Sequence, residues 1–152
     1  MTKPDAAAIA MRLLARREHA FAELVRKLTL RGVDERDARK TVSYLRDQGL
    51  QSEQRYAGVI VRTRSEAGYG MQRIRAELRH QGVAECICEA ALQEHAIDWV
   101  SVARDRIRRR YARDGLDSAR NRSRVLRHLQ QRGFSNEQAR QALESAWDEG
   151  CD

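Results

Sequence analysis

Arginine dominates the residues of this chain that could do chemistry. The 152 residues include 29 Lys and Arg against 22 Asp and Glu, for a net charge of +7. Only Lys3, Lys27 and Lys40 are lysines. The arginine guanidinium is a planar fork of donors that matches phosphate and carboxylate groups. A chain of this charge is expected to meet a polyanion or an acidic protein surface. Heavy arginine use also follows from genome composition alone, and both interpretations stay open.

The densest basic stretch is RDRIRRRYAR, residues 104–113. Six arginines here and on the next predicted helix are expected to line one basic groove: Arg104, Arg108, Arg109, Arg122, Arg124 and Arg127. Such a groove would bind phosphates independently of sequence and with strong salt dependence. The alternative is a charged face that is only solvated. Base-specific reading is disfavoured, because the last helix of each repeat offers mostly Glu, Asp, Ala and Leu.

Residues for catalysis or metal binding are scattered. The histidines share no spacing with a nucleophile or a carboxylate: His19, His80, His95 and His128. No phosphate-binding glycine loop and no HExxH motif occur, so the chain is not expected to be an enzyme. The three cysteines make neither a disulfide framework nor a zinc set: Cys86, Cys88 and Cys151. We expect buried thiols in a reducing compartment, with no metal and no cofactor.

No segment approaches the roughly 18 uninterrupted apolar residues of a membrane span. The N-terminal segment MTKPDAAAIAMRLLARR holds Asp5 and Arg12 within its apolar part, unlike a secretory signal. The sequence therefore predicts a soluble, cytoplasmic protein.

The elements that position these arginines emerge from an internal repeat. Three segments align: FAELVRKLTLRGV (21–33), MQRIRAELRHQGV (71–83) and RSRVLRHLQQRGF (122–134). Each has an apolar residue, a leucine four later and a glycine four after that: Leu24, Leu28, Gly32; Ile74, Leu78, Gly82; Val125, Leu129, Gly133. The register continues through Ala38, Cys88 and Ala139, and then through Val42, Leu92 and Leu143. Apolar residues at this spacing mark one face of a helix, so each unit is helix, glycine stop, helix.

A further helix precedes each pair, near residues 6–17, 52–65 and 99–113. The prediction is an all-α protein of three tandem three-helix, helix-turn-helix-like repeats: 1–50, 51–97 and 98–152. Short repeats bury their apolar stripes against neighbours, so we expect one continuous, elongated and curved array. Asp34 is expected to cap one helix, and Ser135 with Gln138 to form a capping box at another.

The stretch GYG at residues 68–70 marks the turn between the first two helices of repeat 2. Glycine tolerates the positive φ that a tight reversal requires, which would explain Gly68 and Gly70. Tyr69 either packs over this joint or contacts a partner, and the sequence leaves both open.

An ordered set of motifs resembles the RecX regulatory proteins over essentially the whole chain. The first motif is EL..KL..RG, at residues 23–32. The joint GLQSEQRYA carries Glu53, Arg55 and Tyr56. The most specific motif is R..R...GYG...IR.EL...GV, carried by Arg62, Gly68, Tyr69, Gly70, Ile74, Arg75, Glu77, Leu78, Gly82 and Val83. The family usually has Ser where Ala20 stands and often Pro where Met71 stands, so these two helix starts are expected to be looser here.

The resemblance implies an array of three-helix repeats that lies in the groove of the RecA–DNA filament. There it would inhibit the recombinase, ATPase and co-protease activities, and so restrain recombination, DNA repair and the SOS response. Arg62, Arg64, Tyr69 and Arg73 would hold repeat 2, while the arginines of repeats 1 and 3 would grip acidic protomer surfaces or DNA phosphates. Direct contact with single- or double-stranded DNA stays open, and a monomer is expected.

Two other functions remain as alternatives. One is a sequence-independent DNA-binding protein that needs no recombinase. The other is a structural adaptor whose basic charge serves only solubility.

Overall fold

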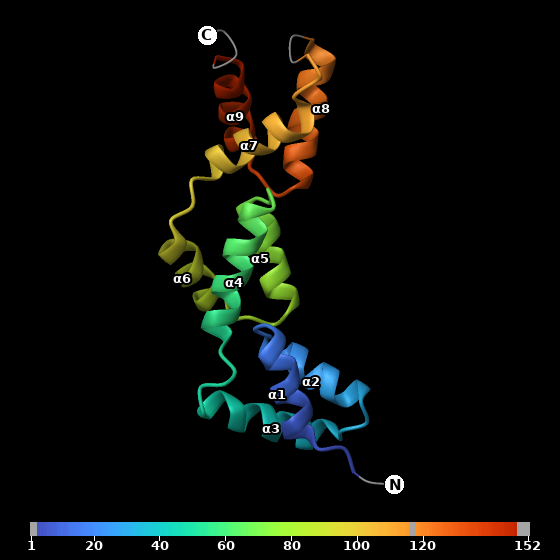
Figure 1. Ribbon diagram of the computed structural model, residues 1–152. Helices are drawn as coiled ribbons and strands as arrows, with labels where there is room; N and C mark the ends of the chain where they lie inside the picture. The colour runs from blue at the N-terminus through green and yellow to red at the C-terminus, as the bar shows by residue number, and fades with distance from the viewer. Residues whose placement is uncertain (1–2, 116–117, 149–152) are drawn as a thin grey trace. The chain divides into compact units, whose positions relative to one another are not determined.

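The computed structural model describes residues 3–115 and 118–148, which hold nine α-helices and no strand (Figure 1). The helices are α1 (Ala6–Arg16), α2 (Phe21–Leu30), α3 (Glu35–Asp47), α4 (Glu53–Glu66), α5 (Met71–His80), α6 (Glu85–His95), α7 (Trp99–Tyr111), α8 (Ala119–Gln131) and α9 (Asn136–Asp148). Taken in threes, they confirm the predicted all-α repeats. The repeat boundaries and the shape of the array stay predictions. No helix in the described part is long and apolar enough to cross a membrane.

The chain packs as two compact units that do not follow the repeat boundaries. Unit 1 comprises residues 1–59 and 78–91, and unit 2 comprises residues 60–77 and 92–152. Helices α4, α5 and α6 contribute to both units, so repeat 2 has no compact unit of its own.

The core of unit 1 is built by α1, α2 and α3. Its buried side chains include four of the predicted register, Leu24, Leu28, Ala38 and Val42, together with Ala10, Val25, Val33 and Leu45. Leu24 and Leu28 are fully buried. Burial of each of these leucine side chains stabilises the folded state by about 1.5–3 kcal/mol, because it removes apolar surface from water.

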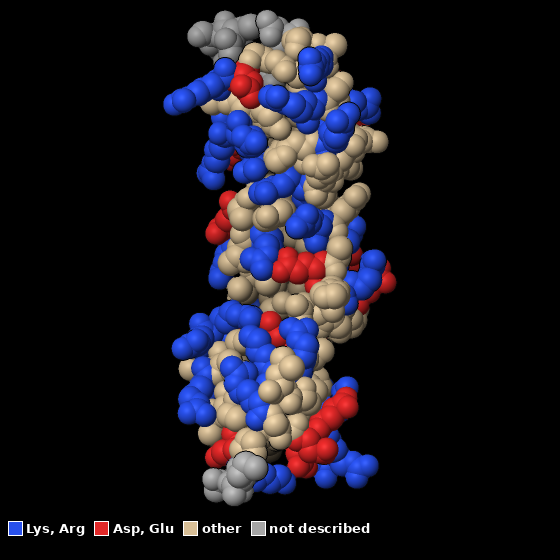
Figure 2. All heavy atoms as spheres, turned by 90° about the vertical axis from the view of Figure 1, so that its right-hand side faces the viewer, with Lys and Arg blue, Asp and Glu red and all other residues tan. Residues whose placement is uncertain are grey.

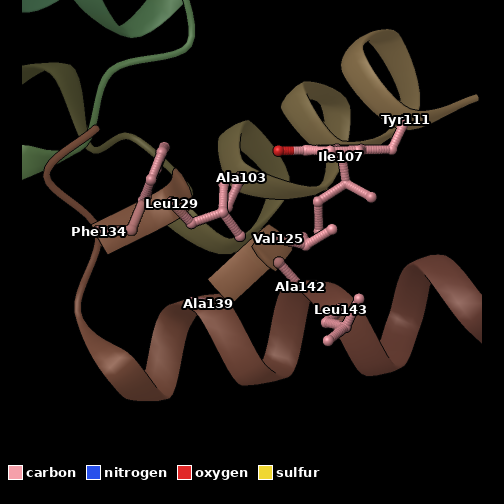
Figure 3. Close-up of a cluster of buried hydrophobic side chains, with 9 residues drawn as sticks. All are labelled: Ala103, Ile107, Tyr111, Val125, Leu129, Phe134, Ala139, Ala142 and Leu143. Carbon is pink, nitrogen blue, oxygen red and sulfur yellow. The ribbon is translucent and has the colours of Figure 1, made fainter. Parts of the chain in front are cut away.

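The core of unit 2 is the equivalent cluster from α7, α8 and α9 (Figure 3). Val125 and Leu129 of α8 face Ile107 of α7 and Leu143 of α9. Alanines at fully buried positions of α7 and α9 let these helices pack closely: Ala103, Ala139 and Ala142. Phe134 closes the cluster directly after the glycine stop of α8.

The glycine stops are confirmed as left-handed residues, with φ of +89° at Gly32, +78° at Gly82 and +100° at Gly133. The amide that follows each glycine donates to the carbonyl five residues back, at 3.1 Å for Val33 and 3.0 Å for Val83 and Phe134. This bond is part of the Schellman motif, and it satisfies a carbonyl that the helix end leaves unpaired.

The predicted helix starts are also confirmed. Asp34 accepts from the amide of Arg36 at 3.2 Å. Ser135 and Gln138 form the reciprocal capping box, with bonds of 3.0 and 3.1 Å.

Gly70 serves a different purpose from the one predicted. Gly68 has φ of +85°, but Gly70 is not left-handed. A Cβ at Gly70 would lie 2.5 Å from the carbonyl oxygen of Gly133 and 2.6 Å from the amide of Phe134. A Cβ at Gly133 would in turn lie 2.5 Å from the backbone nitrogen of Arg73. Gly70 is therefore required by the close approach of two backbones, and the prediction of a positive φ there was wrong.

The prediction of buried cysteines holds for only one of the two that are described. Cys88 is buried, whereas Cys86 is exposed. Two residues along a helix correspond to about 200°, so the residues take opposite faces of α6. Cys151 lies outside the described residues.

The close contact at Gly70 predicts a specific loss of stability. Gly70→Ala should lower the free energy of unfolding by about 3 kcal/mol, because the new methyl group has no space. Gly49 is the matched control, since it has φ of +78° and nothing within 4 Å of its added Cβ. Gly49→Ala should lower it by only about 1 kcal/mol, through backbone strain. Urea unfolding followed by circular dichroism measures both. A smaller loss for Gly70→Ala than for Gly49→Ala would contradict this role of Gly70.

Candidate polyanion-binding surface

The joint between repeats 2 and 3 lies within unit 2 and centres on Arg132. Its guanidinium donates to the carbonyls of Ala67 at 2.6 Å and of Gly68 at 3.2 Å. These carbonyls follow the C-terminal end of α4, where backbone acceptors are unpaired and the helix dipole is negative. The same guanidinium stacks 3.7 Å above the ring of Tyr69, and that of Arg73 lies 5.1 Å from it. Tyr69 thus packs over the joint.

Backbone bonds complete this joint. The amide of Gly70 donates to the carbonyl of Arg132 at 2.8 Å, and that of Gln72 donates to Gly133 at 3.1 Å. These two amides lie at the start of α5, and Gly70, which directly precedes the helix, has no side chain that could cap it. Repeat 3 therefore satisfies the start of α5 with its own loop carbonyls, which replace a conventional cap.

A groove of about 430 Å³ runs between the C-terminal half of α7 and α8. It is lined by Arg110, Tyr111, Asp114, Arg124, Arg127, His128 and Gln131. All three arginines are exposed, and Arg124 pairs with Asp114 at 2.9 Å. The guanidinium carbons of Arg110 and Arg124 lie 5.8 and 5.6 Å from the centre of the Tyr111 ring. Figure 2 shows Lys and Arg side chains gathered over the end of unit 2 that carries α7 and α8. We call this groove the α7/α8 groove.

His128 forms the inner wall of the α7/α8 groove and is held neutral. Its Nε2 accepts from Nε of Arg106 at 3.1 Å, and its ring meets Tyr111 edge-on at 5.8 Å. Burial lowers the pKa of His128, and the charges of Arg106, Arg132 and Arg110 lower it further. The pKa of Arg132 is also lowered, by burial first and then by Arg106, against the opposing effect of Tyr69. Neutral His128 thus accommodates three neighbouring cations.

A second hollow, of about 360 Å³, lies between the end of α4 and α7. Its lining mixes both signs of charge: Ser65, Glu66, Ala67, Gly68, Val102, Asp105, Arg106 and Arg109. The two acids make this hollow a poorer site for phosphate than the α7/α8 groove.

The six arginines predicted to share one groove are divided among several surfaces. Arg124 and Arg127 line the α7/α8 groove, and Arg109 lines the second hollow. Arg104 is half-buried and donates to Ser145 of α9 at 2.8 Å. Arg108 and Arg122 are exposed and line neither of these hollows.

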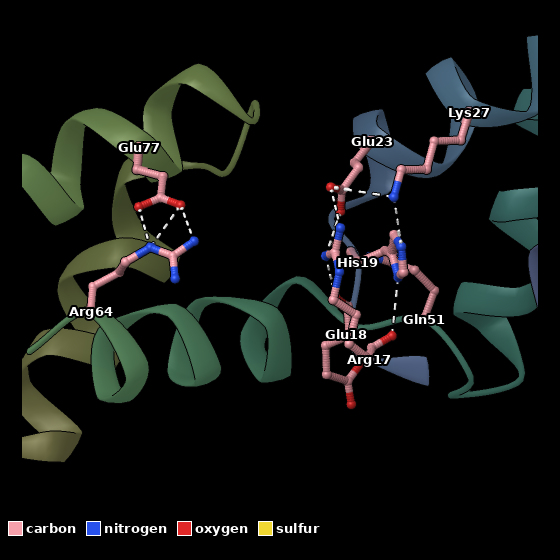
Figure 4. Close-up of polar contacts among 8 residues, drawn as sticks. All are labelled: Arg17, Glu18, His19, Glu23, Lys27, Gln51, Arg64 and Glu77. Atoms are coloured by element: carbon pink, nitrogen blue, oxygen red, sulfur yellow. Dashed lines mark hydrogen bonds and ion pairs between the residues drawn. The ribbon is translucent and has the colours of Figure 1, made fainter. Parts of the chain in front are cut away.

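The residues predicted to hold repeat 2 are divided in the same way. Arg62 is exposed. Arg64 forms a bidentate ion pair with Glu77, with distances from 2.8 to 3.1 Å (Figure 4). Arg73 is exposed and reaches the carbonyl of Gln131 at 3.5 Å. Much of the charge of Arg64 is therefore neutralised within the fold.

Sequence reasoning missed Arg106, Arg110 and Arg132 as members of these sites. Arg106 and Arg110 stand in the basic run and differ by four residues, which puts them on one face of α7. Arg132 directly precedes the glycine stop of α8. That position was a usable signal, because a side chain there is carried into the turn that meets the preceding repeat.

A cluster of ion pairs around the buried Glu23 lies within repeat 1, in unit 1 (Figure 4). The carbonyl of His19, which belongs to this cluster, accepts from the Gln51 side chain of repeat 2 at 3.2 Å. Glu23 is 5% exposed and accepts two bonds from Arg17, at 2.9 and 3.1 Å. Burial alone would raise the pKa of Glu23. The hydrogen bonds from Arg17, together with the charges of Arg17, His19 and Lys27, outweigh burial and lower the pKa. Nε2 of His19 lies 3.1 Å from the ammonium of Lys27. Burial is the main cause of the lowered pKa of His19.

The start of α2 is completed by repeat 2. Ala20 makes no side-chain hydrogen bond to the start of α2, as expected for an alanine at this position. Oε1 of Glu53 instead accepts from the amide of Phe21 at 2.7 Å, and from the buried Gln51 side chain at 3.0 Å. Arg55 bonds Glu18 and the carbonyl of Gly49, both at 2.8 Å. The expected looseness at Ala20 is therefore offset by a carboxylate from the next repeat.

The lowered pKa of His128 predicts a pH dependence of stability. The unfolded chain takes up this proton at a higher pH than the folded chain, so stability is full above the ordinary pKa of about 6.5 and falls below it. The free energy of unfolding should decrease from about pH 7.5 to about pH 5.5, and His128→Gln should flatten that decrease. His19 contributes with the same sign, so the double variant should be flatter still. Urea unfolding across this range measures it, and an equal or steeper slope in His128→Gln would contradict the assignment.

The three-helix repeats match a known protein family. Residues 6–45, 52–92 and 97–143 match the models of the first, second and third three-helix domains of RecX. The regulatory protein RecX of Chromohalobacter salexigens is 40% identical over 139 residues, which cover 91% of each chain. That of Ectopseudomonas mendocina is 41% identical over 143 residues, covering 94% of this chain and 92% of the relative.

Solved structures agree with the fold. The crystal structure of RecX from Lactobacillus salivarius has a TM-score of 0.74 at 21% identity, covering 93% of this chain and 94% of its own. A second crystal structure of regulatory protein RecX has a TM-score of 0.73 at 25% identity, covering 95% and 72%. These likenesses and the three matched domains show that the chain belongs to the RecX family of regulatory proteins, which is not a known family of enzymes.

Proposed function

We propose that this chain is a negative regulator of the RecA recombinase that binds along the groove of the RecA–DNA filament. Bound there as a monomer in the cytoplasm, it would inhibit recombinase, ATPase and co-protease activity and so restrain recombination, repair and the SOS response. Membership of the RecX family supports the regulatory role. The α7/α8 groove is the main structural support for the proposed contact with the filament.

The chemistry of the α7/α8 groove suits phosphates or carboxylates on a large partner. Three exposed arginines face one aspartate. Planar guanidinium groups make paired hydrogen bonds to either acid. The groove is open, and Nε2 of His128 is already engaged by Arg106, so the arginines are the groups offered to a partner.

Several separate basic surfaces favour an extended partner. Exposed arginines occur in each repeat, among them Arg12, Arg62 and Arg127. Each alone would contribute little, because exposed ion pairs are worth about 0–1 kcal/mol. A partner with a repeating surface engages several at once, and linked weak contacts raise the overall affinity strongly. A filament of protomers on DNA is such a partner.

The direct test compares fluorescently labelled single-stranded DNA with the same DNA coated by the recombinase and a nucleotide. Recombinase ATP turnover is followed in the same sample at two salt concentrations. Tight binding to the coated DNA with falling turnover, at concentrations that leave naked DNA free, is the expected result. Equal or tighter binding to naked DNA, with turnover lost only as DNA is sequestered, would favour a DNA-binding protein that needs no recombinase.

A charge substitution in the α7/α8 groove refines the test. Arg127→Gln should weaken binding to the coated filament by about 3- to 10-fold, which corresponds to about 0.7–1.4 kcal/mol. Arg140→Gln is the charge-matched control, because Arg140 is exposed on α9 and does not line the groove. The two variants have the same net charge, so equal losses would mean that only the overall charge matters and would remove the groove from the account.

A further inference from the structure

The outer face of α3 carries three exposed side chains four residues apart, Arg36, Lys40 and Tyr44. Residues at this spacing are neighbours on one helix face, each about one turn from the next. Tyr44 is 62% exposed, which is unusual for an aromatic residue with no packing role. We call these three residues the α3 face.

The two cations of the α3 face are unused by the fold. Among the described residues, neither the Arg36 nor the Lys40 side chain has a hydrogen-bond or ion-pair partner. The other two arginines of α3 are engaged: Arg39 pairs with Glu35 at 3.2 Å, and Arg46 lies 5.0 Å from the Phe21 ring centre. On α3, therefore, Arg39 and Arg46 make contacts within the fold, whereas Arg36 and Lys40 are free to contact a partner.

The internal repeat shows that this combination is specific to repeat 1. The register that aligns Ala38 with Cys88 and Ala139 puts other residues at the equivalent places. In α6 these are Cys86, Ala90 and Glu94, and in α9 they are Glu137, Gln141 and Ser145. Five of these six are exposed, so the face is solvent-facing in every repeat. Only α3 bears two cations and an aromatic ring there.

The polar surroundings of Tyr44 distinguish possible partners. Its neighbours at three and four residues are Lys40, Thr41, Asp47 and Gln48, all polar. The centre of a protein interface would surround an aromatic anchor with apolar residues. A base in a duplex is already stacked on both sides, which leaves no base face for the ring. An unpaired base can stack on an isolated exposed ring, and cations beside it can neutralise the backbone.

We propose that the α3 face binds single-stranded nucleic acid, with one unpaired base stacked on Tyr44 and neighbouring phosphates on Lys40 and Arg36. The strand runs toward the N-terminal end of α3, because Asp47 stands one turn beyond Tyr44 and repels phosphate. The nearby Asp37 carboxylate is paired with Lys3 at 3.2 Å. This site goes beyond the proposed function, since it needs no recombinase.

The test uses a fluorescein-labelled 15-nucleotide oligothymidine and anisotropy at several salt concentrations. Tyr44→Leu should raise the Kd about 10-fold, whereas Tyr44→Phe keeps the ring and should stay near the parent value. Arg36→Gln and Lys40→Gln should each reduce the slope of log K against log salt by about 0.7. Arg39→Gln is the charge-matched control on the same helix, and it should change the slope less. All these side chains are exposed, and circular dichroism checks that the variants remain helical.

Four results would overturn the proposal. The first is a Kd for the oligonucleotide that Tyr44→Leu leaves unchanged. The second is an equal loss for Arg39→Gln, which would reduce the effect to net charge. The third is a Tyr44→Leu loss as large for a 15-base-pair duplex, which would assign the face to duplex DNA. A loss confined to recombinase-coated DNA would likewise assign it to protein. The Arg127→Gln comparison tests the proposed function separately, so either idea can fail alone.

Discussion

A contact between two backbones, at Gly70 and Gly133, is the constraint on which unit 2 depends. Neither residue has space for a Cβ, so the α4–α5 turn and the α8–α9 turn approach more closely than any side chain would allow. That approach lets the carbonyls of Arg132 and Gly133 receive the amides that open α5. It also brings the Arg132 guanidinium over Tyr69 and onto the carbonyls that end α4. One joint thus satisfies two helix ends that would otherwise depend on water.

The first joint solves the same problem with side chains. In unit 1 the carboxylate of Glu53 satisfies the start of α2, and Arg55 and Gln51 hold the adjoining loops. In repeat 3, by contrast, α8 carries its own cap, Ser118, which accepts from Asn121 at 3.1 Å. The middle helices of repeats 1 and 2 therefore start without a cap of their own because the next repeat supplies it. Several residues that carry the family resemblance, among them Glu53, Arg55 and Gly70, are joint residues and do not line the α7/α8 groove.

Arginine has two separate uses in this chain, and this division explains the partial success of the sequence analysis. Apolar spacing and glycine stops predicted every helix within a few residues, because burial and backbone conformation are local in sequence. The buried positions followed the repeat register for the same reason. An arginine has no such signature. Whether it pairs internally, as Arg64 does with Glu77, or stays at the surface, as Arg127 does, depends on residues far away in the sequence.

The errors have specific physical causes. Gly70 was assigned to a turn conformation because the sequence cannot show that the backbone of Gly133 lies against it. The single basic groove was predicted from charge density along the chain, but α7 distributes its arginines around its circumference. Arg104 consequently faces α9, while Arg110 faces α8. The α3 face was not predicted because the composition shared by the last helices, mostly Glu, Asp, Ala and Leu, does not show that α3 alone bears two cations and an exposed ring on that face.

The central claim is that the close joint of unit 2 holds the start of α5 firmly against the α8–α9 turn. Native-state hydrogen exchange of the Gly70 and Gln72 amides tests this most directly. Gly70 precedes α5 and Gln72 lies in its first turn, so neither amide has a hydrogen-bond partner within the helix. Without the joint, both amides would exchange as freely as exposed groups. We expect them to exchange only through the cooperative unfolding that exposes the core amides of Val125 and Leu129. Exchange of Gly70 and Gln72 at the rate of an exposed loop, while Val125 and Leu129 stay protected, would contradict the claim.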